Sequence, residues 1–170
     1  KFYIISTSTS YGMYMYYYHN YPSYSNSTFG LVANNEVRIM GANGAKYGIY
    51  VYGYYSNLNI MHNSVYCISE NSTAYGMYLT PGSSSGTYNT NASRNMFICD
   101  GNTNYPMYIS NTYYATGYGK RSWNNHYSMT GSNIGYAGAA KTTVAAFQTT
   151  TGQDSNLLNI SPRFVKLRNS

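Results

Sequence analysis

Acidic residues are scarce in this chain: only four of its 170 residues are Asp or Glu, and charged residues make up 8% of the sequence. Glycoside hydrolysis normally uses two carboxylates that flank the scissile bond, and a catalytic calcium site needs several carboxylates together with a base. The four acids are far apart in the sequence: Glu36, Glu70, Asp100 and Asp154. Glu70 and Asp100 are the only candidate acidic pair, with Arg94 nearby, so the scarcity argues against a lyase or hydrolase site.

Metal-ligating and nucleophilic residues are also few. His19, His62 and His126 are isolated in the sequence, so we recognise neither a metal-ligand spacing nor a Ser-His-Asp or Cys-His arrangement. Two Gly-rich segments lack the strand-loop-helix context of a phosphate-binding loop and are predicted to be turns. We therefore expect no metal, no cofactor and no catalytic residue.

Basic residues are not concentrated in one region. The formal net charge of +6 arises from the shortage of acids, and Lys120-Arg121 is the only adjacent basic pair. Nucleic-acid binding would require a basic stripe that contacts several phosphates. No apolar run approaches the length of a transmembrane segment. The sequence therefore predicts no nucleic-acid partner and no membrane span.

Tyrosine, by contrast, is abundant, with 24 residues. Eight of these belong to a four-residue motif, Tyr-(Gly/Pro)-hydrophobic-Tyr, whose four starts are separated by 36, 28 and 30 residues. The copies are Tyr11-Gly12-Met13-Tyr14, Tyr47-Gly48-Ile49-Tyr50, Tyr75-Gly76-Met77-Tyr78 and Tyr105-Pro106-Met107-Tyr108. A quasi-period of this size is typical of repeat architectures, in which each unit buries its apolar face against a neighbour.

A second repeated element accompanies the Tyr motif. Three segments that begin with Asn align without gaps at spacings of 28 and 32 residues: Asn35–Ile39, Asn63–Cys67 and Asn95–Cys99. Both elements alternate apolar and polar residues with period two, as half-buried strands do. Each unit is therefore predicted to contain two short strands, connected by turns rich in Gly, Ser, Asn and Thr.

Stacked coils of a parallel β-helix fit these units best, because a propeller blade needs a longer unit and a leucine-rich repeat needs a Leu ladder. Successive coils would lie about 4.8 Å apart, so that equivalent residues form ladders along the axis. Asn35, Asn63 and Asn95 are predicted to stack as an internal amide ladder with a structural role.

Two segments resemble a known family. The segment Tyr47 to Cys67, with "GIYVYGYYSNLNIMHNSVY", resembles coils of right-handed parallel β-helix proteins of the pectate-lyase-like superfamily. The segment Thr143 to Val165, "TVAAFQTTTGQDSNLLNISPRFV", resembles the C-terminal part of secreted Bacteroidetes-type β-helix domains, with a short helix, a turn and a closing strand. The resemblance implies a secreted or cell-surface bacterial protein. It does not select a function, because the superfamily includes lyases, hydrolases, adhesins and inert stalks.

The predicted fold class is all-β: a right-handed parallel β-helix, or solenoid, of about four coils with a short helical and strand C-terminal cap. Residues 1–138 would form the coils, with a lateral loop or an irregular last coil near 113–138, and residues 139–170 the cap. Val144 and Phe147 suit a short helix that Gly152 would end. Phe2 to Ile5 is predicted as the strand of a preceding coil, which would be open to upstream coils of a longer chain.

Cys67 and Cys99 occupy equivalent positions of adjacent predicted coils. Their Cα atoms would lie about 4.8 Å apart, within the range of a disulfide. Parallel strands, however, leave the two sulfur atoms poorly aimed at each other. Two interpretations therefore stay open: a core stack of two small inward-facing residues, or a disulfide formed in an oxidising compartment.

Outward-facing tyrosines form the candidate binding surface. The predicted column and its neighbours are Tyr14, Tyr50, Tyr78, Tyr108, Tyr16 and Tyr52. Aromatic rings with a polar group suit sugars and protein interfaces, although stacked tyrosines also stabilise neighbouring strands. We expect a non-catalytic extracellular module, adhesin-like or structural, that binds a glycan, a partner protein or neighbouring domains of a longer chain. The alternative is a portion of a polysaccharide lyase or glycoside hydrolase whose active-site coils lie upstream.

Overall fold

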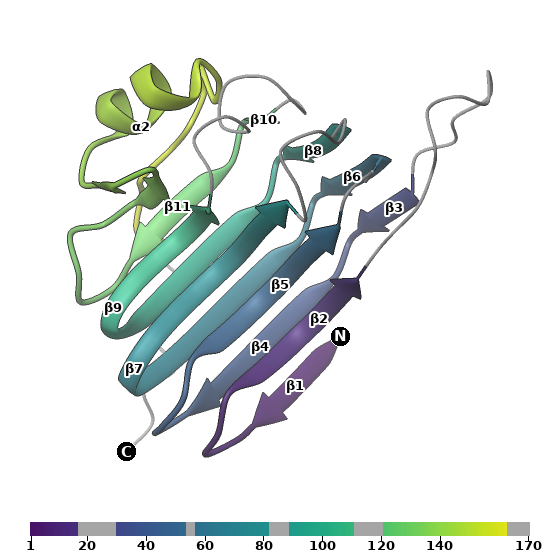
Figure 1. The fold of residues 1–170 in the computed structure, drawn as a ribbon, viewed down its shortest axis with the longest axis vertical. Helices are drawn as coiled ribbons and strands as arrows, with labels where there is room; N and C mark the ends of the chain where they lie inside the picture. Colours follow the sequence, from purple (N-terminus) through teal and green to yellow (C-terminus); the bar gives the residue numbers. More distant parts are fainter. Residues whose placement is uncertain (17–29, 54–56, 82–88, 111–120, 163–170) are drawn as a thin grey trace.

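The computed structural model describes residues 1–16, 30–53, 57–81, 89–110 and 121–162. Over these residues the fold is all-β, with parallel sheets and one short helix (Figure 1). The elements in chain order are β1 (Phe2–Ile5), β2 (Ser10–Tyr16), β3 (Gly30–Ala33), β4 (Glu36–Gly41), β5 (Lys46–Gly53), β6 (Asn57–Met61), β7 (Ser64–Pro81), β8 (Asn89–Ser93), β9 (Met96–Ile109), β10 (Arg121–Ser122), β11 (Asn125–Ser128), β12 (Gly135–Ala137), β13 (Ala140–Lys141) and α2 (Val144–Thr151).

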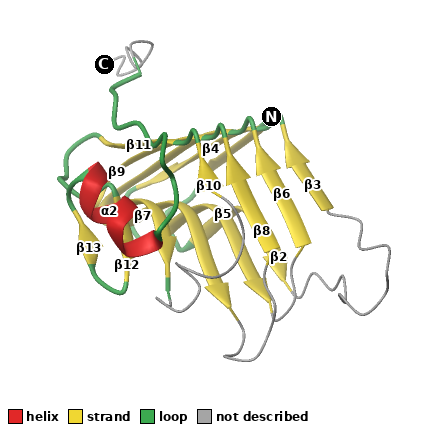
Figure 2. Cartoon of the chain, turned by 90° about the horizontal axis from the view of Figure 1, so that it is seen from above, coloured by secondary structure: helices red, strands yellow, loops and turns green. Residues whose placement is uncertain are grey.

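The strands lie side by side in three parallel stacks. The first stack contains β1, β4, the first halves of β7 and β9, and β11. The second contains β2, β5, the second halves of β7 and β9, and β12. The third contains β3, β6, β8 and β10 and is clearest in Figure 2. The chain therefore passes through the same three positions in successive repeats.

The observed register confirms both repeat alignments made from the sequence. In the first stack, Val37 pairs with Val65, which pairs with Phe97. In the second stack, the Tyr motifs of β2, β5, β7 and β9 pair residue for residue. The alternation is also confirmed, because the apolar residues of both elements point into the space between the stacks. The fully buried core includes Val37, Ile49, Ile60, Val65, Met77, Phe97 and Met107.

Close packing between neighbouring strands explains the Gly of the Tyr motif. A Cβ atom on Gly48 would lie 2.6 Å from the carbonyl oxygen of Gly76, and one on Gly76 would lie 2.5 Å from that of Pro106. Both distances are shorter than any real Cβ contact. Glycine is therefore required at these two positions by the approach of the backbone of the next repeat.

The segment predicted as a lateral loop or irregular last coil, near 113–138, is only partly described. Residues 113–120 lie outside the described residues. The remainder contains β10, β11 and β12, each of which continues one of the three stacks in parallel. β13 then turns back to pair with β12 in the antiparallel direction.

The predicted C-terminal helix is confirmed. Thr143 is the N-cap and its side-chain oxygen accepts a hydrogen bond from the backbone N–H of Ala146 at 3.1 Å. Gly152 ends the helix in the left-handed conformation, with φ of 61°. Phe147 projects from α2 into the core and is fully buried. Figure 1 shows α2 beyond β11 at one end of the stacks, and Figure 2 shows it beside β12 and β13.

Beyond α2, the chain adds to the edge of the first stack. The backbone N–H of Leu158 donates to the carbonyl of Asn124 at 2.8 Å, and that of His126 donates to Leu158 at 2.9 Å. Leu158 forms an isolated parallel bridge with Asn125, whereas residues 159–162 form no strand, so the described part of the cap does not show the predicted closing strand. Residues 163–170 of the predicted cap, including Phe164, lie outside the described residues.

Candidate binding surfaces

The predicted column of tyrosines forms in the structure and gains one member. Tyr136 of β12 is the register partner of Tyr108 and extends the column. Adjacent rings stack with centroids 4.3–5.1 Å apart and interplanar angles of 6–11°. We call this set the trailing Tyr column: Tyr14, Tyr50, Tyr78, Tyr108 and Tyr136. Tyr16 and Tyr52, also predicted, stack on each other at 5.1 Å.

A second column runs beside the first. It consists of the first Tyr of each motif, and we call it the leading Tyr column: Tyr11, Tyr47, Tyr75 and Tyr105. Its adjacent centroids lie 4.7–5.8 Å apart. The ring of each leading Tyr meets the trailing Tyr of its own motif edge to face, at 5.0–5.3 Å. The two columns together form one continuous surface, the Tyr face.

Stacking determines what the Tyr face can offer to a ligand. Within each column the rings lie nearly parallel, so the aromatic faces of the inner members contact one another. Tyr14, on the edge strand β2, is 51% exposed, whereas Tyr50 and Tyr78 are only partly exposed. A ligand on this surface therefore meets hydroxyl groups and ring edges, and ring faces are accessible mainly at the ends of the columns.

Burial raises the pKa of several phenols in the Tyr face, so these phenols are neutral at physiological pH. Burial, followed by the neighbouring tyrosines, raises the pKa of Tyr47 to about 12 and that of Tyr108 to about 12. The same causes raise the pKa of Tyr78. Each hydroxyl can both donate and accept a hydrogen bond. The inner part of the surface is therefore an ordered array of uncharged hydroxyl groups, with two in each repeat.

The predicted Asn ladder forms and is longer than predicted. The amide oxygen of Asn63 accepts from the backbone N–H and the side-chain amide of Asn35, both at 3.0 Å. Asn95 and Asn124 repeat this arrangement along the axis. At the far end, the side-chain amide of Asn124 donates to Asp154 at 3.2 Å.

The Asn ladder is structural, because its inner rungs are buried: Asn63, Asn95 and Asn124 are at most 2% exposed. The residue that precedes each rung adopts a positive φ of 54–58°, namely Asn34, His62, Arg94 and Trp123. This conformation is uncommon for residues other than Gly. The ladder bonds therefore fix a tight left-handed turn in each coil. No ligand can reach the inner amides.

Cys67 and Cys99 are Cα register partners, and both are buried free thiols. The Cys67 thiol donates to the backbone carbonyl of Lys46 at 3.2 Å. Burial raises the pKa of Cys67 to about 12 and also raises that of Cys99. Both side chains are therefore protonated and packed in the core with Ile39 and Ala74.

The structure does not bring the candidate acidic pair into direct register. Asp100 pairs with Ile68, so Glu70 lies two residues further along β7 and is exposed. Asp100 accepts a hydrogen bond from the Thr130 hydroxyl at 2.7 Å. Asp154 is fully buried next to Arg121, with 3.5 Å between carboxylate oxygen and Nε.

The described residues form neither a metal site nor a membrane-spanning helix. Among these residues, no group of three or more His, Cys, Asp or Glu side chains is arranged to hold a metal ion. His19 lies outside them, whereas His126 is buried in the core. In the same described part of the chain, no helix combines the length and apolarity needed to cross a membrane.

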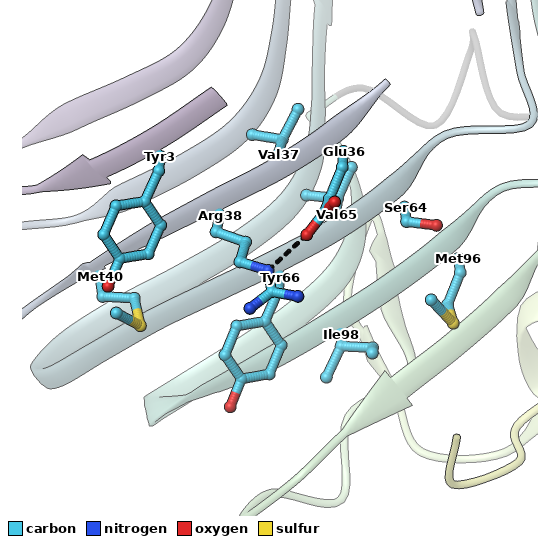
Figure 3. A pocket seen from close by; sticks show the side chains of 10 residues that line it. All are labelled: Tyr3, Glu36, Val37, Arg38, Met40, Ser64, Val65, Tyr66, Met96 and Ile98. Carbon is cyan, nitrogen blue, oxygen red and sulfur yellow. Dashed lines mark ion pairs between the residues drawn. The ribbon is translucent and has the colours of Figure 1, made fainter. Parts of the chain in front are cut away.

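A groove lies on the first stack, over β1, β4 and the first halves of β7 and β9 (Figure 3). Its volume is about 470 Å³. We call it the Arg38 groove, and its lining residues are Tyr3, Glu36, Val37, Arg38, Met40, Ser64, Val65, Tyr66, Met96 and Ile98. Arg38 Nε lies 2.6 Å from a Glu36 carboxylate oxygen, and Lys1 Nζ lies 3.1 Å from the other. Glu36, one of the four acids of the chain, therefore forms ion pairs with two cations on the outer side of the first stack.

Comparison of the chain with protein-family models, curated proteins and solved structures finds no significant match.

Proposed function

We propose that the three strand stacks are the faces of a right-handed parallel β-helix of the pectate-lyase-like type. The support is the parallel pairing within each stack and the return of the chain to the same three positions in successive repeats. Connections between parallel strands of one sheet are right-handed in about 98% of known cases, which favours this hand. An experimental crystal structure tests the proposal, and a left-handed path between stacks would contradict it.

We further propose that the chain is a non-catalytic module of a secreted or cell-surface bacterial protein, and that its Tyr face binds glycans. The observation that carries this proposal is the double column of nine stacked tyrosines with nearly constant spacing. Glycans are rich in hydroxyl groups, which pair well with phenols that both donate and accept. The rings are already ordered by stacking, so little side-chain entropy is lost on binding.

The stacked geometry changes the expected mode of contact. Sugar rings cannot lie flat on the inner tyrosines, because neighbouring rings cover those faces. The glycan would therefore be held by phenolic hydroxyls and ring edges along the column. A partner protein that contacts the same surface is the competing occupant, since tyrosines are enriched at protein interfaces.

A glycan array with matched variants tests the proposed function. The double variant Tyr50→Phe/Tyr78→Phe keeps both stacked rings and removes two hydroxyls. We expect the parent to bind at least one glycan class and the double variant to bind it about tenfold or more weakly, because each hydrogen bond contributes roughly 0.5–1.5 kcal/mol.

Tyr127→Phe is the control, because Tyr127 lies on β11 in the first stack, outside the Tyr face. It should bind as the parent does. Equal binding by the parent and the Tyr50/Tyr78 double variant would show that the Tyr face is not the site. Absence of binding to every glycan would leave a protein partner as the better hypothesis.

A further inference from the structure

We propose that the Arg38 groove is a second binding site, which takes a small carboxylate ligand with an apolar body. The groove lies on β1, β4 and the first halves of β7 and β9, whereas the Tyr face lies on β2, β5 and the second halves of those strands. The two surfaces therefore belong to different strand stacks, and the groove site does not depend on the proposed function of the Tyr face.

The orientation of Arg38 is the first argument for an anionic ligand. Register places Arg38 between Tyr3 of β1 and Tyr66 of β7 in the middle of the groove (Figure 3). Among the described residues, Glu36 is its one ion-pair partner and engages Nε. The two terminal nitrogens of the guanidinium group form a planar fork, which matches the two oxygens of a carboxylate.

The charge balance of the groove also favours an anion. Glu36 is the only acidic residue in the lining, and it is shared between two cations, Arg38 and Lys1. The hydrogen bond from Lys1 and the nearby charge of Arg38 lower the pKa of Glu36, so this carboxylate stays ionised. Arg38 and Glu36 balance each other within the lining, and Lys1, which lies beside the lining, gives this cluster of three charged groups a net charge of +1.

The remaining lining selects the body of the ligand. Met40 and Met96, which are partly exposed, contribute apolar side chains, and Tyr3 and Tyr66 contribute aromatic rings. The volume of about 470 Å³ falls within the range of small-molecule sites, roughly 300–1,000 Å³. A ring or short alkyl chain can therefore pack along the strands while its carboxylate reaches Arg38. A fully polar anion would leave these apolar side chains without a partner.

Titration followed by NMR tests the proposal, with 4-phenylbutyrate as the probe. We expect saturable shifts in the backbone signals of residues 36–40, 64–66 and 96–98. The uncharged amide of the same compound and acetate, which lacks the apolar body, should each bind about tenfold or more weakly, since one loses the ionic hydrogen bonds and the other the apolar contacts.

Arg38→Gln should weaken binding of 4-phenylbutyrate by about tenfold or more, because it removes the charged fork. Arg38→Lys keeps the charge without the fork and should weaken binding by several-fold, which provides a second test if the Gln variant folds poorly. Lys141→Gln is the control, because it removes one positive charge from β13 and not from the groove. Absence of saturable shifts, equal binding of acid and amide, or unchanged binding by both Arg38 variants would overturn the proposal.

Discussion

Replacing Asn95 with alanine is expected to lower the free energy of unfolding by about 3–5 kcal/mol, because each buried polar group left unpaired costs about 1–3 kcal/mol. Asn95 is only 2% exposed. Its amide oxygen accepts two hydrogen bonds from Asn63, both at 3.0 Å. Its amide nitrogen donates to the carbonyl of Ile60 at 2.8 Å and to Asn124 at 3.1 Å. Truncation removes all four hydrogen bonds and leaves buried groups on three residues without their partner.

Two matched variants distinguish the buried ladder from amide side chains in general. Asn35→Ala affects the first rung, which is partly exposed and makes two side-chain bonds, so a loss of about 1–2 kcal/mol is expected. Asn59→Ala removes a side chain that accepts one partly exposed bond from Asn91, at 2.8 Å, and should cost less than about 1 kcal/mol. Urea unfolding followed by circular dichroism measures all three. Losses of equal size for Asn95 and Asn59 would contradict a structural ladder.

The repeat pattern predicted the strand alignments because alternation with period two records which side chains face the core. The Tyr motif and the Asn segments recur at spacings that the register reproduces, and Gly152 ends the helix as predicted. The same pattern failed to identify Asn124 as a fourth rung. In the three predicted rungs, the residue two positions after the Asn is apolar: Val37, Val65 and Phe97. The equivalent residue after Asn124 is the polar His126, so the alternation does not mark this segment as a repeat.

Burial of Lys46 could not be predicted from the sequence. Lysine is almost never fully buried, yet Lys46 is 0% exposed at the start of β5. Its ammonium group donates to the backbone carbonyls of Ser8, Asn43 and Gly44, which belong to turns of two different repeats. These three carbonyls come together only once the strands of the two repeats have paired. The Arg38 groove likewise arises from stacking, because its residues come from four strands that are not adjacent in the sequence.

Replacing His126 with glutamine is expected to make the protein less sensitive to acid. His126 is fully buried between Phe97 and Phe147, with ring centroids 5.8 and 5.4 Å away, and its Nδ1 lies 3.1 Å from the Ile134 carbonyl oxygen. Burial lowers its pKa to about 3; the Ile134 carbonyl acts in the opposite direction, and the charge of Arg121 lowers the pKa further. Glutamine is of similar size, can donate to the same carbonyl and does not titrate.

The direction of the pH dependence of stability follows from the lowered pKa of folded His126. Above pH 6.5 the histidine is neutral in both the folded and the unfolded chain, so its full stabilising contribution is present. Below pH 6.5 the unfolded chain takes up a proton that folded His126 excludes until about pH 3. At pH 4.5, two units below the unfolded pKa, this difference lowers the free energy of unfolding by about 2–3 kcal/mol.

Asp154 changes the pH dependence of stability in the opposite direction to His126, so the two effects have to be separated. Burial raises its pKa to about 6, against the influence of Arg121 and Asn124. The folded chain therefore binds a proton at Asp154 more readily than the unfolded chain does, which adds stability as the pH falls from about 6 to about 4. The parent and the His126→Gln variant both contain Asp154, so the difference between their free energies of unfolding isolates the effect of the histidine.

Urea unfolding at pH 7.5 and pH 4.5 measures this difference. The free energy of unfolding of the parent minus that of the variant should fall by about 2–3 kcal/mol on acidification. An unchanged difference would mean that position 126 accepts a proton in the folded chain, and that it is not enclosed in the core.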